Sequence, residues 1–311
     1  MTFDKYLALA QTALELGLVN GLTVLSLFLS YSMLNVCDLS TDGCFTLGAA
    51  VGALVAIAGY PWLSLPAAML AGMISGFVTA TLQTRMGVQS LLAGIVVNTA
   101  LYSVNMALTG NKATLNMNKV PTVFTMAKDL LKNTPLAGQS TLAVLLIVVA
   151  LVVVFLCFFL RTKLGLAIRA TGSNADMVRS SSINPTFTTT VGLCISNAFT
   201  GLSGCLLAQQ QKNFDINMGQ GMVTVALASL LIGGVFFAKH RPIPLRAVGA
   251  VLGAFVFRLV YALALRFNMP AFMLKAVSAC IVVLAISGPY LRRQIPLMRR
   301  RWQAAREGRR A

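Results

Sequence analysis

The chain has 311 residues, of which 57% are hydrophobic and only 11% are charged, with a mean hydropathy of +0.78. Soluble domains carry about 25% charged residues, so this composition excludes an ordinary soluble protein. The formal charge of +17 comes from 25 basic and 8 acidic residues. The basic residues cluster at the ends of apolar segments and at the C-terminus, which favours an anionic membrane surface over nucleic acid as their partner.

Apolar runs long enough to cross a bilayer, which takes roughly 20 residues, follow one another along the chain. They predict an all-α polytopic membrane protein with about nine transmembrane helices, and eight or ten remain alternatives. The expected spans are 7–34, 43–60, 63–84, 88–109, 139–160, 188–210, 221–238, 243–265 and 270–288. Residues 1–288 then form one transmembrane domain, followed by a basic tail at residues 289–311.

A polar stretch, NVCDLSTDGCFT at residues 35–46, separates the first two spans. It contains two acids, Asp38 and Asp42, and the helix-breaking Gly43. Polar and flexible residues at such a point are typical of a discontinuous membrane helix. An ordinary tight loop is the alternative.

Polar side chains also fall inside the expected span 88–109. Asn98, Tyr102 and Asn105 recur at intervals that place them on one helical face, and Asn197 lies within the span 188–210. Such groups either line a transport pathway or hydrogen-bond neighbouring helices, at about 1 kcal/mol each. The sequence leaves both interpretations open.

The loop at residues 110–138 contains four lysines, and its stretch VPTVFTMAKDLLKN predicts a short amphipathic helix. The segment 161–179, the residues around Lys239 and the C-terminal tail are also basic. Short basic loops stay in the cytoplasm, so these last three are expected inside. The span count between them then places the loop 110–138 outside, in spite of its lysines.

A second polar segment, RATGSNADMVRSSSINP at residues 169–185, separates two long apolar runs. Ser173 followed by Asp176 resembles a capping box, with Gly172 releasing the preceding chain and Asn184-Pro185 ending the helix. These signals predict a short helix at about residues 174–182, within a cytoplasmic segment 172–184. Its polar face would present Asn174, Asp176, Arg179 and Ser180.

Two cations lie within expected spans, Arg258 near the middle of one and Lys275 near the start of another. A charge at bilayer depth costs at least about 2.5 kcal/mol, so it needs a partner or water. Asp38, Asp42 and Glu15 are the acids available for pairing. Structural pairing is the favoured role of Arg258, and solute contact is the alternative.

The two halves of the chain echo one another. Residues 66–96 and 244–282 each begin with proline, continue with a Gly-x-x-x-Gly pair and end in two apolar helices. Five spans separate the two starts, so the copies would have opposite orientations, as in transporters with inverted repeats. Glycine pairs of this spacing are also common in ordinary helix packing.

Motifs of catalysis are missing from the sequence. There is no Gly-x-x-x-x-Gly-Lys-Ser/Thr phosphate loop, no Gly-x-Ser-x-Gly elbow and no His-Glu-x-x-His. The six cysteines show no paired spacing, and His240 is the only histidine. We therefore expect neither an enzyme nor a metal site, and no cofactor held by this chain.

Three motifs resemble those of the permease subunits of ABC importers of the branched-chain amino acid and ribose type. The family's R-T-x-x-G-x-A-x-R-A-x-G-x-N stands at residues 161–174, and its D-L-S-x-x-G stands at residues 38–43. Its A-R-x-x-G-I corresponds to residues 178–183, with Ser182 in place of the glycine. The stretches DLSTDGCFTLGAAVGA and LLAGIVVNTALYSVNMALTG are similar to permeases of the tryptophan/tyrosine importer type.

The resemblance implies a plasma-membrane subunit that moves an amino acid or a similar small solute by alternating access. It implies a second permease copy, two cytoplasmic ATP-binding subunits that hold ATP and magnesium, and an extracytoplasmic binding protein. The coupling residues would be Gly172, Ser173, Asn174, Asp176, Arg179 and Ile183. The hypothetical pathway residues are Asp38, Asp42, Asn98, Tyr102, Asn105, Asn197 and Arg258. An ion-coupled secondary transporter is the alternative, but it leaves the segment 172–184 unexplained.

Overall fold

The computed structural model describes residues 2–130, 139–236 and 242–266, together with a few isolated positions between 276 and 287. The described chain is almost entirely helical. The helices are α1 (Thr2–Leu27), continued by the π-helix η1 (Phe28–Met33), α2 (Thr41–Ile57), α3 (Pro61–Thr84), α4 (Ser90–Leu108), α5 (Val123–Leu130), α6 (Ser140–Phe159), α7 (Lys163–Ser173), α8 (Ala175–Ser180), α9 (Pro185–Gln211), α10 (Met222–Phe236) and α11 (Ile243–Arg266). Two strands, β1 (Thr114–Asn116) and β2 (Asn213–Asp215), pair antiparallel.

Six helices of the described part are long and apolar enough to cross a membrane: α1 with η1, α3, α4, α6, α9 and α11. Helices α2 and α10 are apolar but shorter, with 17 and 15 residues. The expected span 270–288 and the tail 289–311 lie outside the described residues, apart from the isolated positions. The all-α polytopic prediction is confirmed, whereas the count of nine spans is not.

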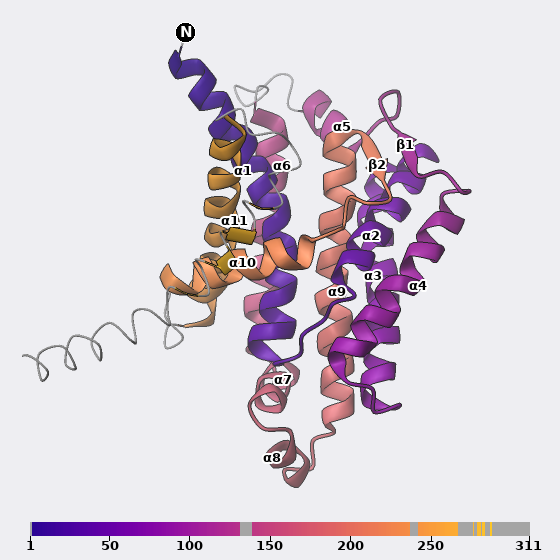
Figure 1. Cartoon of the computed structure of the whole chain (residues 1–311), viewed down its shortest axis with the longest axis vertical. Helices are drawn as coiled ribbons and strands as arrows, with labels where there is room; N and C mark the ends of the chain where they lie inside the picture. The colour runs from indigo at the N-terminus through magenta and orange to yellow at the C-terminus, as the bar shows by residue number, and fades with distance from the viewer. Residues whose placement is uncertain are drawn as a thin grey trace, which may run out of the picture.

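The two shorter apolar helices, α2 and α10, both follow irregular segments. The chain leaves the helix at Leu34, takes a left-handed conformation at Asn35 (φ 58°) and becomes helical again at Thr41. Before α10, strand β2 and a turn that ends at Gly221 (φ 82°) interrupt the helix in the same way. The long helices run along the bundle in Figure 1, but α10 crosses it. We call residues 34–40 the central loop.

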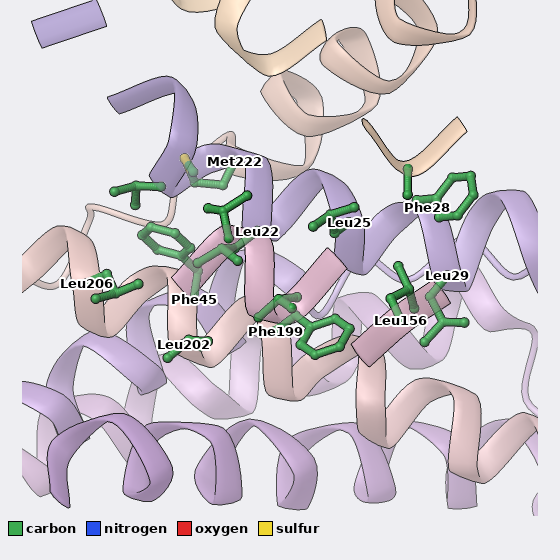
Figure 2. Packing of buried hydrophobic residues seen from close by; sticks show 14 of the residues in the cluster. Leu22, Leu25, Phe28, Leu29, Phe45, Leu156, Phe199, Leu202, Leu206 and Met222 are labelled. Atoms are coloured by element: carbon green, nitrogen blue, oxygen red, sulfur yellow. The ribbon is translucent and has the colours of Figure 1, made fainter. Parts of the chain in front are cut away.

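Helix α9 is the centre of the bundle and packs against α1, α2 and α3. The approach is close because glycines face backbone: a Cβ on Gly48 of α2 would overlap the carbonyl oxygen of Gly201, and one on Gly72 of α3 that of Asn197. In a lipid environment the hydrophobic effect does not drive helices together. Small residues allow the close backbone contacts that stabilise the packing instead. Figure 2 shows the larger side chains between these helices, among them Leu22, Leu25, Phe45, Phe199 and Leu202.

Helix α11 packs against α1 and α10 in a comparable way. A Cβ on Gly253 of α11 would overlap the carbonyl oxygen of Ser229 in α10. On its other side, a Cβ on Gly17 of α1 would stand 3.0 Å from the Cα of Phe255. The glycine pair that the sequence singled out in this helix is therefore a packing surface.

The two ends of the bundle differ. At one end, β1 and β2 pair with Thr114 opposite Asp215, and α5 lies beside them (Figure 1). Helix α5 confirms the short helix expected in the loop 110–138, and the backbone N–H of Val123 holds it by donating to Gln209 Oε1 at 2.9 Å. At the opposite end, α7 and α8 project from the bundle (Figure 1). We call these the β1–β2 end and the α8 end.

Candidate coupling helix and central polar cluster

Helix α8 is a short helix with its own cap. The side chain of Asn174 accepts hydrogen bonds from the backbone N–H groups of Asp176 and Met177, both at 3.1 Å. Asn174 has extended backbone angles (φ −161°, ψ 104°), as an N-cap residue requires. Ser173 is instead the last residue of α7. The prediction that Ser173 caps the helix is wrong, because the break in the helix comes one residue later.

Gly172 has a different role from the one that the sequence suggested. It lies inside α7, and a Cβ there would overlap the carbonyl oxygen of Met33 at the end of η1. The hydroxyl groups of Thr171 and Thr188 hydrogen-bond at 2.8 Å and join α7 to α9. Gly172 therefore does not release the chain. It lets α7 pack directly against the end of η1, while Thr171 joins α7 to α9.

Most of α8 faces outward. Met177 is 67% exposed, and the predicted polar face is on the surface, while Val178 is buried. The exposed polar residues are Asn174, Asp176, Arg179 and Ser180. Beyond the helix, Ser182 adopts the left-handed conformation (φ 60°) and Ile183 is exposed. A left-handed position favours glycine, which explains why the resemblance places a glycine there.

The central loop is held by a buried carboxylate. Asp38 is 1% exposed, and its Oδ1 accepts from the N–H and the hydroxyl of Ser40, at 2.8 and 2.6 Å. Its Oδ2 accepts from Nδ2 of Asn197 in α9 at 2.7 Å. Thr79 of α3 donates to the Ser40 hydroxyl at 3.2 Å. These bonds fix an irregular loop between two helices, as buried irregular backbone in a membrane protein requires.

Asp42 makes a second connection. The backbone N–H of Gly221 donates to its Oδ2 at 2.9 Å, and that of Val223 donates to its Oδ1 at 2.8 Å. Gly221 ends the turn before α10, and Val223 lies in the first turn of the helix. The half-buried Asp42 thus joins the first turn of α2 to the first turn of α10.

The predicted polar face of α4 divides between two surroundings. Asn105 is 1% exposed and donates from Nδ2 to the carbonyl oxygen of Gly43 at 3.3 Å. Asn98 is half-buried and also faces Gly43, where a Cβ would stand 2.7 Å from its Oδ1. Tyr102, which is 49% exposed, lies on the open side of the helix. The two asparagines are brought to the first turn of α2, which follows the central loop, and the tyrosine is not.

Arg258 pairs with neutral groups and not with the acids suggested by the sequence. With the amide of Asn20 turned so that its oxygen faces the guanidinium, Nε and Nη2 both donate to that oxygen, Nη2 at 2.6 Å. The guanidinium also lies 5.5 Å from the ring centroid of Tyr261. Of the three acids, Asp38 and Asp42 are engaged in the cluster above, and Glu15 accepts from Gln210 at 3.0 Å. The predicted cation Lys275 lies outside the described residues.

The sequence pointed to Thr200 as a polar group within its span, but it did not reveal the row of hydroxyl groups that joins α1 to α9 there. The Ser26 and Ser196 hydroxyls are 2.8 Å apart, Thr200 donates to Ser26 at 2.8 Å, and Thr23 donates to Ser203 at 2.9 Å. The spacing of Ser196, Thr200 and Ser203 along one helical face was the available signal. Among the described residues, no group of three His, Cys, Asp or Glu side chains could hold a metal ion.

Comparison with known proteins adds independent findings. The family "Branched-chain amino acid transport system / permease component" matches residues 10–286. A tyrosine transport system permease protein of Clostridioides difficile is 30% identical over 86% of each chain. A nucleoside ABC transporter permease of Lactococcus lactis is 26% identical over 66% of this chain and 63% of its own. A guanosine ABC transporter permease of Bacillus subtilis is 27% identical over 70% of each. No solved structure matches the chain.

Proposed function

The chain belongs to the branched-chain amino acid permease family, as a membrane-spanning subunit of an ABC importer, and from this premise we propose that it moves an amino acid or a similar small solute by alternating access. As a transport subunit it is not an enzyme, and its family implies ATP-binding and substrate-binding partners. ATP and magnesium would be held by the ATP-binding partner.

The observation that supports this mechanism most directly is the anchoring of α8. The helix is exposed and capped, and α7 connects it firmly to η1 and α9 through Gly172 and Thr171. A force on α8 would therefore act on the central helix and not on a flexible linker. We assign to it the contact with an ATP-binding subunit, through Asn174, Asp176, Arg179 and Ile183.

The α8 end is assigned to the cytoplasm. Arg161, Lys163, Arg169 and Arg179 all lie at this end, in or beside α7 and α8. The positive-inside rule for short loops supports the assignment. The C-terminal tail would lie on the same side and contact anionic lipid through its arginines.

Helix α4 is the helix that we assign to the contact with a second copy and to the pathway. Its exposed side carries Thr99, Tyr102 and Ser103 together with apolar side chains such as Leu92, Ile95 and Val96. The large exposed side chains of α6 are all apolar, as a lipid-facing helix requires: Leu146, Ile147, Leu151, Val154, Phe155 and Phe158. We propose a homodimer in which Thr99, Tyr102 and Ser103 of α4 face water between the copies, while its apolar residues contact lipid or the second copy. The central cluster of Asp38, Asp42, Asn98, Asn105 and Asn197 would support that wall from behind.

The packing supports an inverted repeat. Helix α3 packs against α2 and α9, and α11 packs against α10 and α1. Exchanging α1 with α9, α2 with α10 and α3 with α11 converts one set of neighbours into the other. Both α2 and α10 also follow an irregular segment. Two opposed units of this kind would let the pathway open to either face by rocking.

The test is uptake by the whole complex. The permease would be reconstituted in liposomes with its ATP-binding subunit and its binding protein, and supplied with radiolabelled tyrosine or guanosine. We expect ATP-dependent accumulation of tyrosine. Accumulation of guanosine alone would show that the transported solute is a nucleoside and not an amino acid. Uptake driven by an ion gradient without ATP would contradict the proposed mechanism.

A further inference from the structure

Helices α2 and α10 begin beside one another inside the bundle, and Asp42 connects them. Each of its carboxylate oxygens accepts one backbone N–H from the start of α10, at 2.9 Å from Gly221 and at 2.8 Å from Val223. The turn before α10 lies directly on α2, because a Cβ on Gly219 would overlap both the Asp42 carbonyl oxygen and the Thr46 hydroxyl. The connection is therefore short and closely packed.

The chemistry of this contact is that of a helix cap supplied by another helix. The first N–H groups of a helix have no partner within it, and an N-cap side chain normally accepts from one of them. Here Asp42 accepts from one such group, the N–H of Val223, and from the N–H of Gly221 just before the helix, and it also places a negative charge at the positive end of the α10 dipole. Both oxygens are engaged, so the carboxylate is not free to bind a solute in this conformation.

The same turn of α2 also contacts α4. Asn105 donates to the carbonyl oxygen of Gly43 at 3.3 Å, and Asn98 faces Gly43 from the same helix. Residues 42 and 43 thus have α10 on one side and α4 on the other. A displacement of α4 would reach α10 through a hydrogen-bonded path of two residues.

We propose that Asp42 is a positioning residue of the transport cycle, whose carboxylate ties α10 to the first turn of α2, the turn that also contacts α4, so that the three helices move together. This inference rests on the proposed function and assigns a mechanical role to one of its residues. Without the carboxylate, two N–H groups would lose their acceptor and α10 would move independently of α4. ATP hydrolysis by the partner would then continue without effective solute movement.

The experiment compares Asp42→Asn, Asp42→Ala and Asp42→Glu with the wild-type complex in liposomes. For Asn and Ala we expect assembled complexes that hydrolyse ATP at about the wild-type rate, with uptake lowered at least about tenfold, the scale of a lost charge-assisted hydrogen bond. Glu retains the charge and should recover part of the uptake. The matched control is Asp215→Asn, because Asp215 also accepts a backbone N–H, from Asn217 at 2.7 Å, but joins no two helices.

A second measurement does not depend on transport. Amide hydrogen exchange in residues 221–225 of the purified permease should accelerate at least about tenfold in Asp42→Asn and stay unchanged in Asp215→Asn, whose acceptor bond lies outside this stretch. Unchanged exchange, or wild-type uptake by Asp42→Ala, would overturn the inference. If the Asp42→Ala complex fails to assemble, the amide exchange rate of Asp42→Asn still tests whether Asp42 ties α10 to α2. A wild-type complex that moves no solute would contradict the proposed function instead, and the exchange experiment would still test the contact.

Discussion

At the scale of single residues, the position of a cap depends on where the backbone leaves the helix. Ser173 and Asn174 are both good capping residues, and the sequence favoured the first because an acid follows it at the capping-box distance. The structure makes Asn174 the cap, since its backbone is extended while Ser173 is still part of α7. The pattern predicted the existence of the short helix but placed its start one residue too early and its end two residues too late. The helix ends at Ser180, and Asn184 does not end it but caps the start of α9.

This difference provides a test. Asn174→Ala should destabilise α8 by about 1 kcal/mol, because two backbone N–H groups lose their acceptor, and it should reduce stimulation of the ATP-binding subunit. Ser173→Ala should leave the stability of α8 unchanged. Amide exchange across residues 174–182 and ATPase assays of the reconstituted complex would measure both effects. Equal effects of the two substitutions would contradict the assignment of the cap.

At the scale of elements, α1 and α11 enclose the Arg258 guanidinium, whose partners in the described part of the chain are neutral groups. The buried amide of Asn20 and the ring of Tyr261 are its partners. The sequence predicted correctly that Arg258 needs a partner, because a charge at bilayer depth is costly. It predicted the wrong chemistry for that partner, because Asp38 and Asp42 are committed to the central loop and to α10.

The interaction between Asn20 and Arg258 can be measured with single and double variants. Asn20→Leu should lower the free energy of unfolding by about 2 kcal/mol, since it leaves the Arg258 guanidinium without its acceptor. Adding Arg258→Met should restore most of that loss, because an apolar pair of similar volume removes the unpaired charge. Thermal denaturation of the purified protein in detergent measures both. Purely additive losses would show that the two residues do not interact.

At the scale of the whole molecule, the two ends of the bundle are built differently. One end has the β1–β2 pair and α5, and the other has α7 and α8 with their basic neighbours (Figure 1). The assignment of these ends to the two sides of the membrane predicts a labelling pattern. The substitution Met177→Cys is made in a variant whose native cysteines have been replaced. Its cysteine should react with a membrane-impermeant maleimide only in inside-out vesicles.

The exposed Lys119 provides the opposite marker, because it lies in the loop beside β1. Lys119→Cys should react only in right-side-out vesicles or intact cells. Labelling of both positions from one side would contradict the assigned topology.

The sequence by itself determined the membrane class, the long apolar spans, the amphipathic α5 and the presence of a capped helix between two basic stretches. These are local properties, because hydropathy, turn residues and capping side chains act over a few neighbouring positions. Only the tertiary structure decided the partners of Asp38, Asp42, Asn105 and Arg258. Their hydrogen bonds join residues that lie about 60 to 240 positions apart, and no short pattern records which buried polar groups meet when the helices pack.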